Sequence, residues 1–324
     1  MLPADPTRAP APRCSVVIVT WNRRAELEAL LKSVFRQTIA DSLEVIVVEN
    51  GSTDGTAAWL RDEFPEPVKL VAFEKNEGAC RGRNEGIRRS RGRYITFLDS
   101  DAELLDDGLI EGCLKFLTEQ KEIRAVGAPI WMDRARTKPF VMGGYITPEG
   151  HFDGQRSFTE TDDPHFLSTC FCVWEKSLLE ELGGFNPWYF WGIEDMDISL
   201  RCSWNARRGR TKAASHFVIL KHGAVLHEMS PRGRHYQPGD FEKAFHAIEW
   251  QRLYLVLSYG GLVEMLRVVF TTPFHMDRVQ EDAWQQRLGW KKKIWCAVIY
   301  PLWRLLMLPK DLITLRKDHL KIHN

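Results

Sequence analysis

Short, continuous apolar runs rich in β-branched residues alternate with stretches of helical periodicity over the first hundred residues. A continuous apolar run is typical of a strand buried on both faces, and apolar residues three and four apart are typical of a helix that packs on one side. The predicted strands are residues 14–20, 43–48, 68–73 and 94–98, with helices between them. Because strands that alternate with helices form parallel sheets with right-handed crossovers, we expect an α/β fold with a doubly wound, mostly parallel sheet flanked by helices.

The pattern becomes less regular after residue 100. Helical spacing returns over residues 107–117 and 175–182, and a further helix is predicted to begin at Glu194. Apolar runs predict strands over residues 125–130, 166–174, 215–220 and 224–227. Residues 131–165 are rich in Gly, Pro, Asp and Thr, which predicts a loop-rich insertion that bears a hairpin.

Polar residues follow three of the predicted strands at the edge where parallel strands end. Thr20-Trp21-Asn22 follows the first strand, Glu49-Asn50 the second and Asp99-Ser100-Asp101 the fourth. Open α/β sheets bind ligands at this edge, and carboxylate oxygens suit Mg²⁺ or Mn²⁺, which commonly bridges a protein to the phosphates of a substrate. The pattern therefore predicts a metal and phosphate site. The alternative is that Asp99 and Asp101 only cap the helix that follows.

A second cluster of acids, Glu194-Asp195-Met196-Asp197, comes directly after the aromatic stretch 185–191. Aromatic rings beside a carboxylate form a platform on which a sugar can stack, and Asp195 is then a candidate general base. The alternative is that the helix dipole alone favours acids in a first helical turn. Asp197 and Arg201 lie four residues apart and are predicted to pair on one helix face.

Composition and charge indicate a globular protein with an uneven charge distribution. The 324 residues are 44% apolar with a net charge of +1. Residues 1–200 contain 23 Lys and Arg against 33 Asp and Glu, whereas residues 201–324 contain 21 against 10. This basic second part favours an anionic surface as a partner.

The seven cysteines lack a Cys-x-x-Cys spacing and are predicted to be reduced core residues. Cys170 and Cys172 could be a metal pair, but we interpret them as packing residues on one strand face.

The two ends of the chain differ from its centre. Residues 1–13 predict a disordered leader without the apolar core of a secretion signal, which favours a cytoplasmic protein. Residues 236–324 predict a helical, basic extension. Its apolar run 294–308 is short for a membrane span, which needs about 20 residues, and suits a helix at the inner face of an anionic membrane or one buried against protein. Nucleic-acid binding is disfavoured because the aromatic residues of this part are not interleaved with its cations.

Four sequence blocks, in order, resemble the family 2 glycosyltransferases, which have the fold called GT-A. The blocks are residues 15–23, 47–56, 76–87 with 97–101, and 183–185 with 194–198. The resemblance is greatest to bacterial rhamnosyltransferases and related enzymes of polysaccharide assembly. It implies a GT-A catalytic domain over residues 14–235, with a nucleotide-sugar half (14–130) and an acceptor half (131–235).

The resemblance also implies an activity and roles for residues. The activity is inverting transfer of a sugar from a nucleoside-diphosphate sugar to a hydroxyl group of a cell-surface glycan or lipid-linked precursor, with Mn²⁺ or Mg²⁺ as cofactor. Asp195 would be the catalytic base, and His227 would bind the metal with Asp99 and Asp101. The implied nucleotide-sugar contacts are Thr20, Trp21, Asn22, Glu49, Gly78, Arg81, Asn84, Asp99 and Ser100. The implied acceptor contacts are Trp191, Gly192 and Glu194.

Two features depart from the family pattern. Glu49 stands where Asp is common, which can alter the choice of nucleotide base, and the basic Arg81-Gly82-Arg83 is not universal. Two other functions are weighed against transfer. A non-catalytic nucleotide-sugar-binding or scaffold protein would not need the retained acids. A nucleotidyltransferase would need a glycine-rich phosphate loop after the first strand, and neither a G-x-G-x-x-G nor a Walker motif occurs there.

Overall fold

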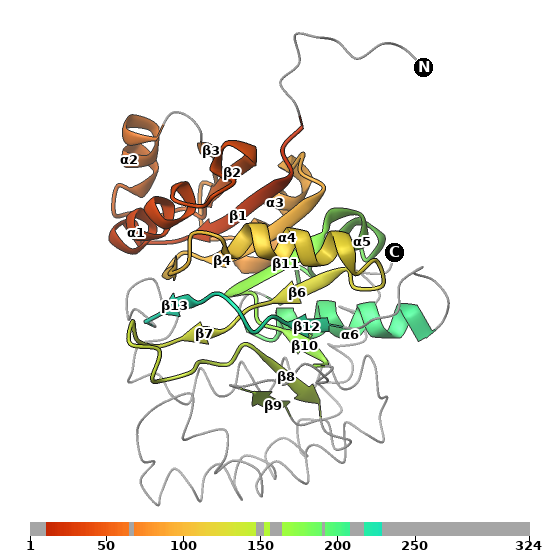
Figure 1. Cartoon of the computed structure of the whole chain (residues 1–324). Coiled ribbons are helices and arrows are strands. Elements are labelled where there is room, and N and C mark those ends of the chain that lie inside the picture. Colours follow the sequence, from red (N-terminus) through yellow and green to blue (C-terminus); the bar gives the residue numbers. More distant parts are fainter. Residues whose placement is uncertain are drawn as a thin grey trace, which may run out of the picture. The chain divides into compact units, whose positions relative to one another are not determined.

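The computed structural model describes residues 11–64, 68–146, 152–155, 164–189, 192–207 and 217–228. Its main element is a seven-stranded sheet in the order β12-β6-β11-β4-β1-β2-β3 (Figure 1). The strands of this sheet are β1 (Cys14–Thr20), β2 (Leu43–Glu49), β3 (Val68–Ala72), β4 (Tyr94–Asp99), β6 (Ala125–Gly127), β11 (Phe171–Glu175) and β12 (Phe217–Ile219). Most residues of β1, β2 and β4 are buried, as their continuous apolar runs predict.

The four strands predicted from the first hundred residues pair in parallel, so their carboxyl ends meet at one edge. The register places Thr20 beside Glu49 of β2, and Val19 beside Asp99 of β4. On the other side of β4 the sheet is mixed, because β11 runs antiparallel to both β4 and β6. The predicted α/β fold with a mostly parallel sheet is confirmed.

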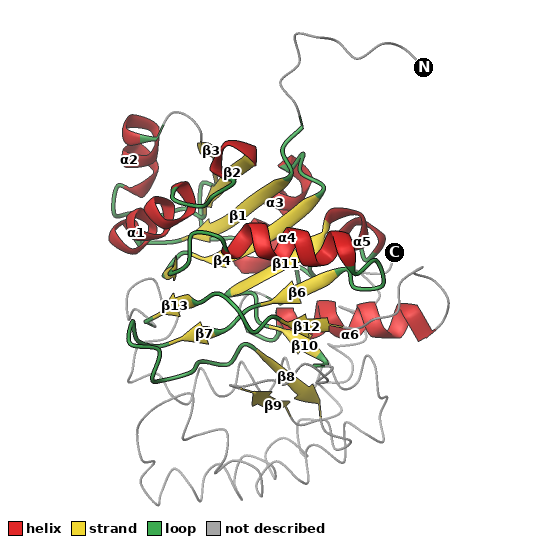
Figure 2. Ribbon diagram, in the orientation of Figure 1, coloured by secondary structure: helices red, strands yellow, loops and turns green. Residues whose placement is uncertain are grey.

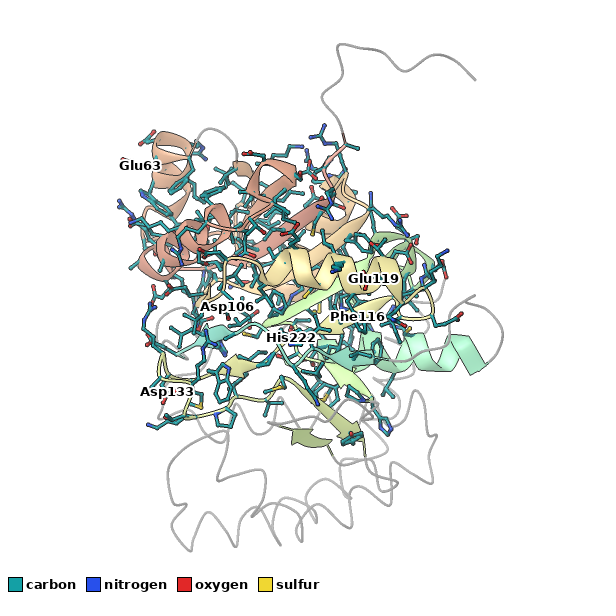
Figure 3. The ribbon with its side chains drawn as sticks, in the orientation of Figure 1. Glu63, Asp106, Phe116, Glu119, Asp133 and His222 are labelled. Atoms are coloured by element: carbon teal, nitrogen blue, oxygen red, sulfur yellow. The ribbon has the colours of Figure 1, made fainter. Side chains whose placement is uncertain are left out.

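The helices lie between the strands, as the periodicity predicts (Figure 2). They are α1 (Arg24–Phe35), α2 (Thr56–Glu63), α3 (Ala79–Arg89), α4 (Leu109–Glu119), α5 (Lys176–Glu181) and α6 (Glu194–Arg207), with a short 3₁₀ helix, η1 (Ala40–Ser42). Phe116 and Glu119, labelled in Figure 3, mark the last turn of α4. Helix α3 packs closely on β1, because a Cβ at Gly82 would lie 2.7 Å from a methyl carbon of Val19.

Two predicted strands are each divided in the structure. The run 125–130 forms β6 and then β7 (Ile130–Trp131), which belongs to a second sheet with β5 (Ala102–Leu104) and β13 (Val225–His227). Pro129 lies between the two and cannot donate a ladder hydrogen bond, which explains the break. The run 166–174 forms β10 (Phe166–Leu167) and β11, separated by a turn.

The interpretation of Asp99 and Asp101 as helix caps is wrong. Strand β5 follows Asp101 directly, and the next helix, α4, begins at Leu109. Ala102 and Leu104 alternate with the more exposed Glu103, which suits a strand, and β5 pairs antiparallel with β13. Asp99 therefore ends β4, and Asp101 lies between β4 and β5, two strands of different sheets.

The predicted insertion contains β8 (Gly143–Ile146) and β9 (Phe152–Gln155), neighbouring strands of a third sheet in the order β10-β8-β9.

The chain divides into two compact units, Met1–Gly144 with Gly154–Gln237, and Tyr145–Asp153 with Pro238–Asn324. The predicted leader and C-terminal extension lie outside the described residues, apart from residues 11–13. Among the described helices, none has the length and apolar character needed to cross a membrane. The six cysteines in the described part are all free and buried, as predicted.

Candidate active site

The loops that follow β1 and β2 are tied together at the carboxyl edge of the sheet. Glu49 is buried, and its Oε1 accepts a hydrogen bond of 2.6 Å from the backbone N–H of Ser52. Asn22 has a positive φ of 53°, donates its backbone N–H to Ser52 Oγ and accepts the N–H of Thr53. Thr20 is buried, and its Oγ1 has no hydrogen-bond partner among the described residues. This edge therefore has a fixed backbone and an unused hydroxyl group.

The predicted nucleotide contacts on and before α3 have different surroundings. Gly78, with a φ of 88°, lies at the sheet edge, where its carbonyl accepts from Asn50 Nδ2 at 3.3 Å. The Arg81 side chain is exposed and pairs with Glu77 at 3.0 Å. The Asn84 amide both donates to the carbonyl of Phe185 and accepts its N–H, each at 2.7 Å. Asn84 thus anchors the loop after α5, and the nucleotide contact of each residue stays a prediction.

A charged cluster surrounds the Asp99-Ser100-Asp101 turn. Asp101 forms an ion pair with Arg23, which lies before α1, and its Oδ1 is 3.3 Å from His227 Nε2. Burial would raise the pKa of Asp101, but the hydrogen bond and charge of His227 and the charge of Arg23 lower it well below its usual range. His227 comes close because it pairs with Ala102, the residue after Asp101, in the ladder between β13 and β5. Ser100 is buried between the two acids.

The residues of this turn fit a divalent metal ion. One potential ligand atom from each of Asp99, Cys170 and His227 lies within 4.8 Å of the other two. His227 Nδ1 is buried and has no hydrogen-bond partner in the described part of the chain. Carboxylate, imidazole and thiol are all metal ligands, so an ion could be held here with Asp101 adjacent. The structure thus brings the three predicted metal residues together and adds Cys170.

Arg83 connects this turn to the second cluster of acids. From the buried face of α3, its Nη1 donates to Glu194 Oε1 at 2.7 Å and its Nη2 donates to Asp99 Oδ1 at 3.1 Å. Arg83 and Glu194 are each 6% exposed. Since one guanidinium group reaches both carboxylates, the carboxyl end of β4 and the start of α6 lie on either side of it.

Asp195, next to this bridge, is partly exposed, unlike its neighbour Glu194. Burial within the site and the negative charge of Glu194 raise the pKa of Asp195 to about 7, although Arg83 opposes the shift. Its Oδ1 accepts the backbone N–H of Met196 at 2.8 Å. Gly192 and Ile193 both have positive φ, so the chain enters α6 through a strained turn. A carboxyl group with this pKa can accept a proton near neutral pH.

The other predictions for this region have different outcomes. Asp197 and Arg201 form the predicted pair, with Arg201 Nε donating to Asp197 Oδ2 at 2.9 Å. Trp191, an implied acceptor contact, lies outside the described residues. Gly192 and Glu194 lie next to Asp195, and their acceptor roles stay predictions.

Residues 15–183 match the model of the family described as glycosyl transferase family 2. The match spans 169 of the 324 residues. The chain belongs to glycosyl transferase family 2. This assignment confirms the family resemblance, and the matched residues include the first three of the four sequence blocks. The greater likeness to rhamnosyltransferases remains a prediction.

Two curated relatives of this family 2 chain come from Bacillus subtilis strain 168. The putative teichuronic acid biosynthesis glycosyltransferase TuaG is 37% identical over 111 residues, which are 34% of this chain and 43% of TuaG. The minor teichoic acid biosynthesis protein GgaB is 29% identical over 163 residues, which are 49% of this chain and 17% of GgaB. The matched part is thus less than half of the length of either relative.

Solved structures show that this family 2 chain has the GT-A fold. Residues 1–349 of Staphylococcus aureus TarS, in complex with UDP-GlcNAc, align with a TM-score of 0.55 and 17% identity, covering 87% of this chain and 77% of that one. The mannosyltransferase PcManGT of Pyrobaculum calidifontis, in complex with GDP-Man and Mn²⁺, aligns with a TM-score of 0.52 and 18% identity, covering 97% and 75%.

Three residues of the site were not predicted from the family 2 blocks. Arg83 carries one usable signal, because it shares α3 with Gly82 and Gly86, whose lack of side chains marks the face that packs on β1. An arginine on a buried face needs carboxylate partners. Arg23 and Cys170 carry no comparable signal, because their partners are distant in the sequence and meet them only through strand pairing.

Proposed function

We propose that the chain transfers a sugar from a nucleoside-diphosphate sugar to a hydroxyl group of an acceptor, with inversion at the anomeric carbon. The observation that carries this proposal is the Arg83 bridge, with hydrogen bonds of 3.1 Å to Asp99 and 2.7 Å to Glu194. It joins the Asp99-Ser100-Asp101 turn, whose residues would bind the metal, to a carboxylate pair that includes Asp195, the proposed general base. Transfer needs both parts close together, one for the leaving diphosphate and one for the attacking hydroxyl group.

The metal-binding residues would hold the donor. Asp99, Asp101 and His227 would bind Mn²⁺ or Mg²⁺, and such an ion, once bound, supplies positive charge for the diphosphate that leaves. Arg23 adds a second cation beside Asp101. The loops after β1 and β2, with Thr20, Trp21 and Glu49, would contact the nucleoside.

Asp195 would act as the general base. As the acceptor oxygen forms its bond to the anomeric carbon, the bond from that carbon to the diphosphate oxygen breaks, and the hydroxyl proton passes to Asp195. A well-placed general base contributes roughly 10²–10⁴-fold to the rate. Glu194 is fixed by Arg83 and so positions the first turn of α6. One displacement of this kind inverts the anomeric carbon.

The names of relatives support a class of acceptor. TuaG and GgaB are named for teichuronic and minor teichoic acid biosynthesis, and a further relative, from Campylobacter jejuni, is a GalNAc(5)-diNAcBac-PP-undecaprenol β-1,3-glucosyltransferase. We therefore propose a cell-surface glycan or lipid-linked precursor as acceptor, and a hexose or a deoxyhexose such as rhamnose as the transferred sugar. The basic residues 236–324, which lie outside the described residues, would hold the enzyme at the inner face of the membrane.

Release of nucleoside diphosphate from a panel of UDP-, GDP- and dTDP-sugars, measured with and without Mn²⁺, tests the proposal. Hydrolysis or transfer of at least one donor in the wild type, lost in Asp101→Ala and kept in Asp107→Asn, is the expected result. Asp107 is an exposed acid with its side chain 55% accessible, which makes it a suitable control. Binding of a nucleotide sugar without any release would instead support the non-catalytic alternative.

A further inference from the structure

Cys170 lies beside the Asp99-Ser100-Asp101 turn because β11 pairs antiparallel with β4. Strand β11 runs antiparallel to β4, with Phe171 opposite Leu98. The residue before β11 therefore lies beside the residue that ends β4, and the backbone N–H of Asp99 donates to the carbonyl of Cys170 at 3.2 Å. Cys170 is 1% exposed, and its own N–H donates to Ser168 Oγ. The backbone at Cys170 is thus fixed by hydrogen bonds of its carbonyl and its N–H.

His227 reaches the same point from the other sheet. Its ring is nearly perpendicular to that of Phe140, with ring centroids 4.7 Å apart, so Phe140 packs against the imidazole. The ligand atoms of Cys170, His227 and Asp99 lie within 4.8 Å of one another. Two strand pairings that are independent in the sequence therefore place a thiol, an imidazole and a carboxylate around one point.

Cys172 provides a comparison two residues along the chain. It is also fully buried, but it lies within β11 and accepts a hydrogen bond from Trp174 Nε1 at 3.2 Å. It belongs to no group of metal-binding residues in the described part of the chain. The expectation that both cysteines share one strand face fails, because Cys170 lies in the turn before β11. Packing accounts for Cys172, whereas the Cys170 thiol lies against the imidazole of His227.

We propose that Cys170 is a thiolate ligand of the divalent-cation site, together with Asp99 and His227. A set of sulfur, nitrogen and oxygen ligands favours thiophilic ions such as Zn²⁺, Co²⁺ and Cd²⁺ over Mg²⁺. Binding of the ion releases the thiol proton to solvent as the sulfur–metal bond forms. The inference rests on the proposed function for the presence of a cation at this turn and deepens it by naming the class of ion.

Titration of the reduced, metal-free chain of residues 1–324 with Co²⁺ tests this without any sugar donor. The wild type is expected to develop a near-ultraviolet thiolate-to-cobalt charge-transfer band at one equivalent. The band should be lost in Cys170→Ser and kept in Cys172→Ala, the matched control. Calorimetry should show Cd²⁺ affinity reduced by roughly 10–100-fold in Cys170→Ser, with Mn²⁺ affinity changed much less.

Two results would overturn the inference. In the first, the wild type binds Co²⁺ without developing the band. In the second, the band persists in Cys170→Ser. Absence of the band in the wild type overturns the inference even if Cys170→Ser fails to fold. If only the proposed function fails, the charge-transfer band still forms, but no nucleotide sugar releases its nucleoside diphosphate.

Discussion

Arg83→Met is expected to lower the free energy of unfolding more than any exposed substitution on the same helix. The side chain of Arg83 is 8% exposed, bonds Glu194 and Asp99, and lies over the ring of Phe185 at 5.5 Å. Methionine keeps most of the aliphatic length and removes the cation. The substitution therefore separates the electrostatic role of Arg83 from its packing.

The magnitude follows mainly from Glu194. Its side chain is 7% exposed, and its Oε2 already lacks a hydrogen-bond partner among the described residues, so Arg83 is the main compensation for the buried charge. Asp99 has a third of its side chain exposed, and water can solvate much of it. Removing one partner of a buried ion pair costs about 3–5 kcal/mol. We expect a loss in this range, nearly all of it from Glu194.

Urea denaturation followed by far-ultraviolet circular dichroism measures this loss. The double variant Arg83→Met with Glu194→Gln should recover about 1–3 kcal/mol relative to the single variant, because no buried charge is left unpaired. Arg88→Met is the matched control on α3, since the exposed pair of Arg88 with Glu85 is worth about 0–1 kcal/mol. A loss below about 1 kcal/mol for Arg83→Met, or no recovery in the double variant, would refute the reasoning.

Three further predictions follow from the same structure. Gly86→Ala should lower the free energy of unfolding by about 1–2 kcal/mol, because its Cβ would collide with Val17. Gly112→Ala, in open space on α4, should raise the free energy of unfolding by about 0.5–1 kcal/mol. Chemical denaturation of both variants checks that the two changes have opposite signs. Transfer should slow about tenfold from pH 8 to pH 6, because Asp195, with its pKa raised to about 7, must be ionised to accept a proton; a flat rate profile contradicts this. Because the unfolded pKa of Asp195 is about 3.9, the stability it contributes is complete below that pH and is lost as pH rises through about 7. Asp195→Asn should therefore weaken the pH dependence of the free energy of unfolding between about pH 4 and pH 7.

Much of the fold could be predicted because its signals are local. Continuous apolar runs such as that ending at Thr20 identify buried strands without knowledge of their neighbours, and parallel pairing follows from the helices between them. The two strand breaks were missed. The break at Pro129 does carry a local signal, because proline cannot donate a ladder hydrogen bond, whereas the turn before Phe171 lies within a mostly apolar run. Strand β5 was missed for a different reason, since its three residues become a strand only by pairing with β13.

The site was predictable where its residues follow strands or begin helices. Asp99, Asp101 and Asp195 occupy such positions, and family resemblance supplied His227. Cys170 was assigned to packing, because its place beside Asp99 depends on antiparallel pairing between β11 and β4, two strands more than seventy residues apart. Pairing between strands so far apart in the sequence produces no periodic pattern of apolar residues.

The most direct test of the central claim is transfer by Asp195→Asn, measured under single-turnover conditions with a donor that the wild type uses. The account predicts that the variant binds the nucleotide sugar with wild-type affinity in calorimetry, while its rate of transfer falls by roughly 10²-fold or more. Nuclear magnetic resonance of the wild-type product should show an inverted anomeric carbon. Transfer by Asp195→Asn at close to the wild-type rate, with retained donor binding, would contradict the account.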